Sequence, residues 1–483
     1  MIPILLLLQS LPEQAFSQGM ELARDGQWEA ARKAFTRGQS AAPKDKRFPL
    51  ELAGVEYRLG DYSAAARRLR RALRLDPADA YGNEFLGTLY YLDGNYEAAL
   101  SRWNRIGKPR LGGVEIDPPP PVAPALLDRA LLFAPGELLT VGDYRRTEAR
   151  LAGLDALNSF RLELAARPGD RYDARLRWVP RPRWGAALSA ASELPYQAVR
   201  LDLSNLAHRA ITWSGLYRWD AQRRRAFTSL SGPLSGDPKW RWKLFGDARS
   251  ETWNLGGATD FRLRKVAAGG EIRSLASERV SWSSGFDVST RAPGLAVRYR
   301  GTADYRFLNA PEKRLTADLT GASEIARLFT DAGGVFAREQ VSAVLRWLPQ
   351  ARGEDYETVI RAGAGWASKR TPFDELFILG LERDNDLALR GHLGTRGGKK
   401  GSAPLGRRYI LTNFELYKRV YHGDWLTLDA GPALDTGRMD DGEFLIDAGA
   451  VVRLRILGSF GVALSYARDL RGGRGAYYSY PVH

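Results

Sequence analysis

From residue 183 to residue 483 the sequence alternates between two kinds of side chain, and this alternation limits the fold more than any other feature. In Val297–Phe307 every odd position is apolar, aromatic or small, and every even position is charged or polar. Lys239–Leu244 and Ile446–Ile456 repeat the pattern. A period of two is typical of a β-strand whose two faces meet different surroundings. No helical stretch of convincing length interrupts these runs, so this region is predicted to be all-β.

Two all-β folds share this alternation. A soluble sandwich turns its apolar residues inward, whereas a membrane barrel turns them toward lipid. The region is longer than one sandwich usually needs, and many runs carry Trp or Tyr near their ends, as membrane interfaces require. We therefore expect a transmembrane antiparallel β-barrel over residues 183–483. About 16 strands would leave roughly 19 residues for each strand and its connection, of which about 9 to 11 cross the bilayer.

The N-terminal region contains an internal repeat. The triplets Gly26-Gln27-Trp28, Gly60-Asp61-Tyr62 and Gly94-Asn95-Tyr96 are spaced by 34 residues, the period of the tetratricopeptide family. Residues 12–109 resemble that family over about three repeats, which implies an all-α solenoid whose concave groove docks a protein partner. A structural spacer is the alternative. The repeat signature consists of small residues at positions where helices meet and of prolines that end two of the repeats. These residues are Gly19, Ala31, Pro43, Ala53, Ala65, Pro77, Gly87 and Ala99.

Residues 110–182 read as a small α+β domain. A strand at Gly113–Ile116 is followed by two helical stretches, Ala125–Leu132 and one that contains Tyr144 and Leu154. Two strand-like runs, 159–164 and 174–179, then form a hairpin. This order resembles a POTRA domain, the periplasmic module that precedes certain outer-membrane barrels. The resemblance implies a sheet edge that can receive an extended client strand; an unrelated α+β linker domain is the alternative.

A Gly-rich stretch inside the barrel region carries Leu389, Arg390, Gly391 and His392. Taken alone, an Arg-Gly pair fits a solvated turn equally well. Its place in the sequence resembles the BamA/TamA superfamily of outer-membrane barrels, which includes the two-partner-secretion translocators. In that superfamily a loop with a (Val/Leu)-Arg-Gly-(Phe/Tyr) motif folds back into the barrel lumen. His392 departs from the usual aromatic residue, although an imidazole ring can still pack there.

The resemblance also implies an acidic partner for the loop arginine, in a Phe-x-Asp-x-Gly motif on the barrel wall. The matching run is Thr427–Gly431, with Thr427 in place of Phe. Alternation independently turns Asp429 and Gly431 toward the lumen. An Arg390–Asp429 pair is therefore predicted, and Glu415, on the inward face of its own strand, is a second candidate acceptor.

Composition argues against several other functions. The net charge is +15, but the basic residues are spread along the chain without a run, so no nucleic-acid partner is expected. The chain has no cysteine, which excludes disulfides, thiolate metal sites and thiol nucleophiles. Its four histidines form no HExxH-type spacing, and the Gly397–Lys400 run fails the phosphate-loop pattern. We therefore expect no enzyme, no metal and no cofactor.

The resemblance places the barrel in the outer membrane of a Gram-negative-type bacterium, with the N-terminal domains in the periplasm. Residues 1–11 are interpreted as a signal-peptide remnant, although their apolar run lacks a basic start and a clear cleavage site. The implied function is insertion or translocation of client polypeptides, with outer-membrane lipid and assembly components as partners. Two alternatives stay open: a transport pore or anchor without insertase activity, and a soluble all-β binding protein joined to helical repeats.

Overall fold

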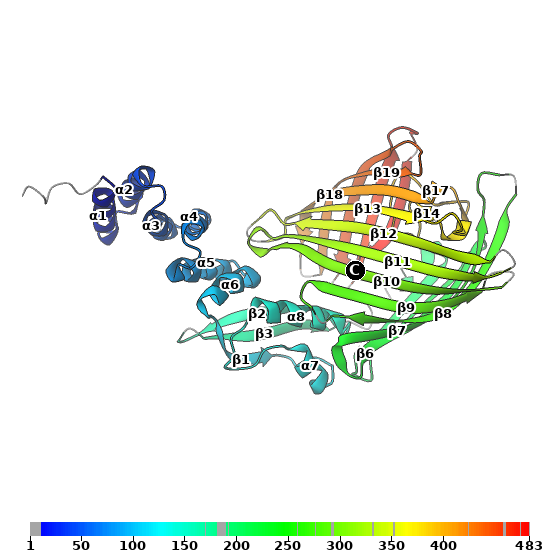
Figure 1. Ribbon diagram of the computed structural model, residues 1–483, viewed down its shortest axis with the longest axis horizontal. Coiled ribbons are helices and arrows are strands. Elements are labelled where there is room, and N and C mark those ends of the chain that lie inside the picture. Colours follow the sequence, from blue (N-terminus) through cyan, green and yellow to red (C-terminus); the bar gives the residue numbers. More distant parts are fainter. Residues whose placement is uncertain are drawn as a thin grey trace, which may run out of the picture. The chain divides into compact units, whose positions relative to one another are not determined.

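The computed structural model describes residues 11–482, apart from positions 170, 181–189, 192, 258, 276, 291–293, 331–332, 351–352, 424, 457–459 and 474. Residues 1–10, most of the predicted signal remnant, lie outside the described residues. The chain forms two compact units (Figure 1). One contains residues 1–114, 133–144 and 163–174, and the other contains residues 115–132, 145–162 and 175–483.

The N-terminal region folds into six helices that pack as three successive pairs, which confirms the predicted repeats. The helices are α1 (Leu11–Arg24), α2 (Trp28–Ala41), α3 (Arg47–Arg58), α4 (Tyr62–Leu75), α5 (Ala80–Leu92) and α6 (Tyr96–Trp103), followed by the 3-10 turn η1 (Asn104–Ile106).

The signature residues lie where helices touch. A side chain at Gly19 would place its Cβ 2.5 Å from the ring of Phe35, and one at Gly87 would lie 2.4 Å from the ring of Trp103. Only a glycine therefore lets these helices approach so closely. The signature alanines are fully buried, and the two prolines follow the ends of α2 and α4; these residues are Ala31, Ala53, Ala65, Ala99, Pro43 and Pro77.

The three repeat turns differ in one respect. The side chain of Asp61 accepts a hydrogen bond from the Ala64 amide at 2.7 Å, and Asn95 accepts one from the Ala98 amide at 3.2 Å. Gln27, the equivalent residue of the first turn, has nearly the same backbone angles and makes no side-chain cap. The first repeat therefore lacks an N-cap that its backbone is already shaped to hold.

Gln27→Asp is expected to supply this cap and to stabilise α2 by about 0.5 to 2 kcal/mol. Hydrogen exchange at the Ala30 amide of the full chain should slow in the variant. The amide hydrogen bond from Ala64 lowers the pKa of Asp61. An aspartate cap at position 27 should behave likewise, so its stabilisation is complete above the ordinary aspartate pKa and disappears as the pH falls through the lowered value. Unchanged exchange near neutral pH would contradict the prediction.

The next region contains β1 (Arg110–Ile116), α7 (Pro124–Ala130), α8 (Val141–Gly153), β2 (Leu157–Arg167) and β3 (Arg171–Pro180). The three strands form one sheet in the order β1-β3-β2, so β2 is an edge strand. Strand, two helices and hairpin is the predicted order of elements. The identification of this domain as a POTRA domain stays a prediction.

Both ends of this domain have their own packing. Within the first unit, Tyr172 packs against the ring of Trp103, with centroids 4.8 Å apart. Within the second unit, α7 and α8 share an apolar core with Ala210 of the first barrel hairpin. The Ala123 amide donates to the His208 carbonyl at 2.8 Å, which ties the segment before α7 to the turn of that hairpin.

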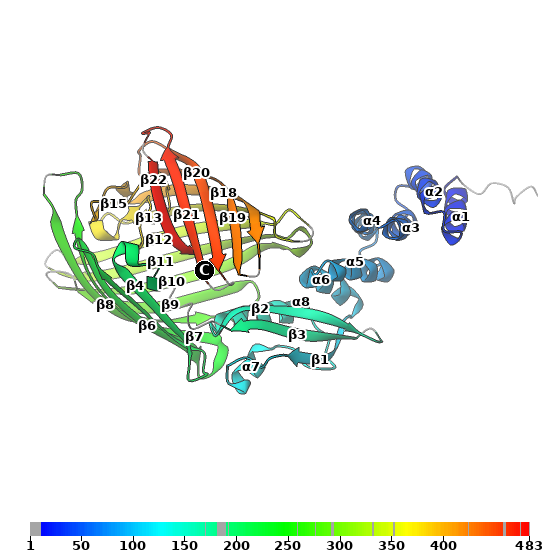
Figure 2. The ribbon, with the colours of Figure 1, turned by 180° about the vertical axis from the view of Figure 1, so that it is seen from behind.

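The C-terminal region is a closed antiparallel barrel (Figures 1 and 2). In its strand order the last strand, β22, lies next to the first, β4. Its order also includes two very short strands, and β13 pairs directly with β18. The long strands are β4 (Ala198–Leu206), β5 (Ile211–Trp219), β6 (Arg223–Leu234), β7 (Asp237–Trp253), β8 (Phe261–Ser274), β9 (Val280–Thr290), β10 (Leu295–Ala310), β11 (Leu315–Phe329), β12 (Gly334–Trp347), β13 (Tyr356–Ala367), β18 (Arg408–His422), β19 (Leu426–Met439), β20 (Leu445–Ile456), β21 (Phe460–Asp469) and β22 (Gly475–Val482).

Smaller elements complete the description. The 3-10 turns η2 (Leu194–Tyr196) and η3 (Pro311–Lys313) precede β4 and β11. The segment between β13 and β18, residues 368–407, leaves the barrel wall and is called the lumen loop below. It holds η4 (Phe373–Glu375), β14 (Phe377–Ile378), β15 (Thr395–Arg396), β16 (Lys399–Lys400) and β17 (Leu405–Gly406).

The alternation of the sequence becomes the two faces of the barrel. In β10, Arg298 is 4% exposed and its neighbour Val297 is 38% exposed. In β18 the same holds for Glu415 and Phe414, at 2% and 36%. Charged residues thus face inward and apolar residues outward, which is the reverse of a soluble core and suits contact with lipid. The predicted barrel class is confirmed.

Among the described residues, no helix combines the length and the apolar character that crossing a membrane requires.

Candidate functional site in the barrel lumen

The lumen loop contacts the inner wall on several separate sets of strands. Its Arg390 reaches β18 and β19, whereas its Lys400 reaches β7. These strands are far apart in the order of the barrel, and the contacted side chains are buried inward-facing ones. The loop therefore crosses the interior, as the resemblance of its Arg-Gly motif implies.

Arg390 is 4% exposed and binds two acids. Its Nη1 donates to Oδ1 of Asp435 at 2.5 Å, and its Nη2 contacts Glu415. The Arg390 amide also donates to Asp435 at 3.0 Å, and Asn413 donates to the same carboxylate at 2.7 Å. Main chain and side chain of Arg390 are thus both fixed to the wall. A buried charge is tolerated when it is paired and hydrogen-bonded in this way.

The predicted Arg390–Asp429 pair is wrong. Asp429 does face inward, but it accepts from Arg419 at 3.0 Å and contacts Arg455 at 3.3 Å. Asp435 lies six residues further along the same strand and on the same face, a distance of about 20 Å at roughly 3.3 Å per residue. Alternation fixes the face of a strand but not the height along it.

The sequence did contain a signal for the right residue. Asp435 is followed two residues later by Gly437, so the Asp-x-Gly spacing occurs twice in β19. Gly431, the glycine of the run chosen from the sequence, lies against β18, where an added Cβ would sit 1.6 Å from the Leu416 carbonyl oxygen. This glycine therefore serves the close pairing of β18 and β19. Glu415, the second candidate acceptor, does contact Arg390.

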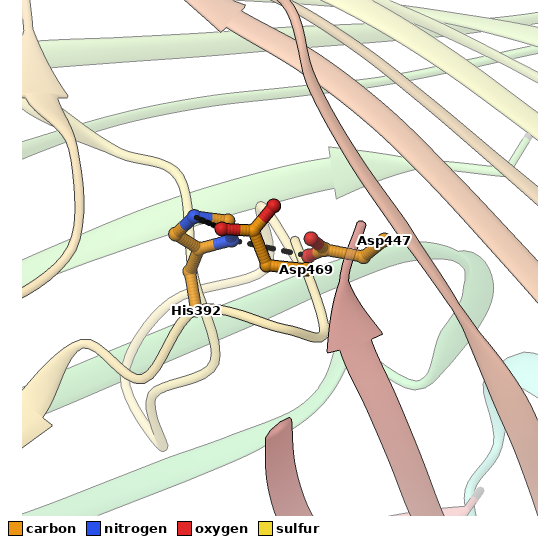
Figure 3. Close-up of side chains that lie close together, drawn as sticks. All are labelled: His392, Asp447 and Asp469. Atoms are coloured by element: carbon orange, nitrogen blue, oxygen red, sulfur yellow. Dashed lines mark hydrogen bonds and ion pairs between the residues drawn. The ribbon is translucent and has the colours of Figure 1, made fainter. Parts of the chain in front are cut away.

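The other motif residues hold the loop close to the wall. Leu389 is fully buried in an apolar cluster that includes Phe377 and Leu411. The Gly391 amide donates to Oδ2 of Asp447 at 2.5 Å. His392 places Nδ1 3.2 Å from the same oxygen and Nε2 3.7 Å from Oδ2 of Asp469 (Figure 3).

Gly391→Ala is expected to displace the motif from β20 and β21. A Cβ at position 391 would lie 2.6 Å from Oδ1 of Asp447 and 2.7 Å from the Asp469 amide nitrogen. Neither group can retreat easily, because both belong to the barrel wall. The variant should expose the lumen loop to trypsin in the folded, detergent-solubilised protein. Gly321→Ala in β11 is the control, since a Cβ there meets nothing within 4 Å and the backbone is not in the left-handed region; equal protection of Gly391→Ala and wild type would contradict the prediction.

The loop forms a second buried network of ion pairs, away from Arg390, that the sequence did not predict. Nζ of Lys400 lies 2.9 Å from Glu251 and 3.3 Å from Glu382, and all three residues are buried. Asp384 binds Arg225 at 2.5 Å and Arg218 at 3.1 Å. In the sequence these are ordinary charged positions of strands and a loop, and nothing marks which of them meet.

A third network lies at the start of the loop. Glu375 of η4 contacts Lys265 of β8 and accepts from Arg298 of β10 at 3.1 Å. Glu324 of β11 also contacts Arg298, at 3.2 Å. The start of the loop is therefore fixed to a different part of the wall from its Arg390 motif.

The loop also touches the junction between the first and last strands. Arg383 forms an ion pair with Glu193 and lies over the ring of Tyr196, 3.4 Å from its centroid. The hydroxyl of Tyr196 lies 2.5 Å from Oγ of Ser479 in β22. Arg383 and Tyr196 thus connect the loop, the approach to β4 and the final strand.

Known proteins are similar to the N-terminal and to the C-terminal part of the chain. The family profile for the tetratricopeptide repeat matches residues 16–66 and 50–108. CdiB from Escherichia coli aligns with 78% of this chain and 75% of its own, at 14% identity and a TM-score of 0.50. BamA from Haemophilus ducreyi, in a structure lacking POTRA domains 1–3, aligns with 77% of this chain and 84% of its own, at 11% identity and a TM-score of 0.42.

No curated protein matches the sequence. Because the chain is only 14% identical to CdiB, the similarity between the two shows a shared fold and nothing more. The chain combines an N-terminal tetratricopeptide-repeat region with a C-terminal β-barrel whose fold is similar to that of CdiB.

Proposed function

We propose that this protein lies in the outer membrane and assists the insertion or translocation of other polypeptides there. One observation carries the proposal: a barrel with the fold of CdiB is crossed by a loop that buried ion pairs fix to separate parts of its inner wall. Such a loop determines the shape of the lumen. In this proposal Arg390, Glu415 and Asp435 position the loop and perform no catalysis.

The N-terminal domains are assigned to the periplasm and to docking. β2 is an edge strand of its sheet, and an edge strand can pair with an extended client through main-chain hydrogen bonds. The groove of the tetratricopeptide repeats would recruit a client or an outer-membrane assembly component. Crosslinking from β2 in intact cells tests the first role, and protease protection in intact cells tests the periplasmic orientation.

The experiment reconstitutes the full chain in proteoliposomes and adds a small outer-membrane barrel unfolded in urea. Faster acquisition of heat-modifiable gel mobility by the client, relative to empty vesicles, supports insertion. Protection of an unfolded polypeptide inside the vesicle supports translocation. The Arg390→Ala variant, reconstituted to the same folded amount, should lose most of either activity.

The alternative of a transport pore or anchor predicts a different result. Ion conductance without any effect on the client would replace the proposal with the pore. Recovery of the protein in the soluble fraction, without a mobility shift on boiling, would contradict the outer-membrane location altogether.

A further inference from the structure

Three side chains that lie far apart in the sequence meet beside the loop motif. His392 comes from the lumen loop, Asp447 from β20 and Asp469 from the end of β21. One ligand atom of each lies within 4.8 Å of the other two. Figure 3 shows both carboxylates next to the imidazole.

The burial of Asp447 makes this more than a surface cluster. Asp447 is fully buried, and its Oδ2 accepts from the Gly391 amide. Its other oxygen, Oδ1, has no hydrogen-bond partner among the residues that the structure describes. A buried carboxylate oxygen without a donor is costly unless a cation or another donor completes it.

We propose that His392, Asp447 and Asp469 bind a divalent transition metal ion. An imidazole nitrogen with two carboxylate oxygens is a donor set that Zn²⁺ accepts, with bonds of about 2.0 to 2.2 Å and a water as fourth ligand. Around a tetrahedral ion such bonds place ligand atoms roughly 3.3 Å apart. The two short contacts use different ring nitrogens: Nδ1 lies 3.2 Å from Asp447 and Nε2 lies 3.7 Å from Asp469. One ligand atom of each residue lies within 4.8 Å of the other two, so rotation of the side chains has to close the set around an ion.

The nitrogen ligand decides the class of metal. Ca²⁺ and Mg²⁺ prefer all-oxygen sites, whereas imidazole suits Zn²⁺, Cu²⁺, Fe²⁺ and Ni²⁺. The bound ion would join the loop to β20 and β21 at the position where the Arg390 network ends. The site thus adds a metal-dependent attachment of the loop, whether or not the protein acts on client polypeptides.

The test uses the full chain, folded in detergent, treated with a chelator and freed of affinity tags. Titration with Zn²⁺ is followed by calorimetry, and metal content is measured after desalting. We expect one tightly retained Zn²⁺ for each chain. Co²⁺ in place of Zn²⁺ should give absorption bands of a nitrogen- and oxygen-ligated ion.

Two ligand variants and one matched control complete the design. His392→Phe keeps a ring of similar size, and Asp469→Asn keeps the shape of the side chain. Each should weaken Zn²⁺ binding by more than about tenfold, because loss of a residue that merely holds a metal ligand already costs about that much. His422→Phe is the control, because His422 is exposed and contacts Thr427. Heat-modifiable mobility checks that each variant is folded.

Two results would overturn the proposal. One is a wild-type protein that retains no Zn²⁺ or Co²⁺, in which case the His392 imidazole is only a neighbour of the two acids. The other is unchanged binding in folded His392→Phe, which would place the bound metal elsewhere.

Discussion

Arg390→Ala is expected to lower the free energy of unfolding of the barrel by about 3 to 5 kcal/mol, the cost of removing one member of a buried ion pair. Among the residues that the structure describes, Asp435, at 1% exposure, would keep Asn413 as its one side-chain hydrogen-bond partner. Glu415 suffers less, because Arg361 also donates to it at 2.8 Å. The measurement is the urea concentration at which half of the protein, in detergent, has lost the gel mobility of the folded barrel.

Arg396→Ala is the matched control for this prediction, since Arg396 is an exposed arginine of the same loop. Exchanging the charges, with Arg390→Asp and Asp435→Arg together, should recover part of the stability that either change alone removes. The pair Arg390→Asp with Asp429→Arg should recover none, because those residues do not meet. Recovery by the second pair rather than the first would contradict the contacts described above.

Lys400→Met is expected to lower the same free energy of unfolding by about 3 kcal/mol. It leaves Glu251 and Glu382 buried without their shared cation. The effect stays near the lower end of the range because Arg223 also donates to Glu382, at 3.3 Å. Trypsin should cleave the loop of the folded variant faster than that of the wild type.

The neighbouring residue provides the control for the second prediction. Lys399 pairs with Asp260 at 2.5 Å, and both side chains are about one-third exposed. Surface pairs of this kind contribute about 0 to 1 kcal/mol. Lys399→Met should therefore leave the urea midpoint almost unchanged, and equal effects of the two lysine variants would show that Lys400 is not buried in its ion pairs.

Much of the fold followed from periodicity. Alternation in runs such as Val297–Phe307 predicts strands and their two faces without any tertiary information, since successive side chains point to opposite sides. The spacing of Gly26, Gly60 and Gly94 predicts the helical repeats in the same way. Both signals are local, and a single sequence contains them fully.

The contacts of the site followed only in part. Alternation turned Asp429 and Asp435 toward the same lumen, and their heights along β19 depend on the register with β18 and on the path of the loop. A local sequence pattern determines neither the strand register nor the path of the loop. The same holds for His392 and its two acids, because the absence of a spacing motif excludes only ligands that lie close together in the sequence.

The three ion networks of the lumen loop are attached to different sectors of the barrel wall. The loop therefore connects these sectors across the lumen. Any widening of the cross-section would stretch all three attachments at once. Small fluctuations of the barrel circumference should therefore be suppressed. Enlargement of the barrel should occur as a single cooperative event, after the ion networks have broken.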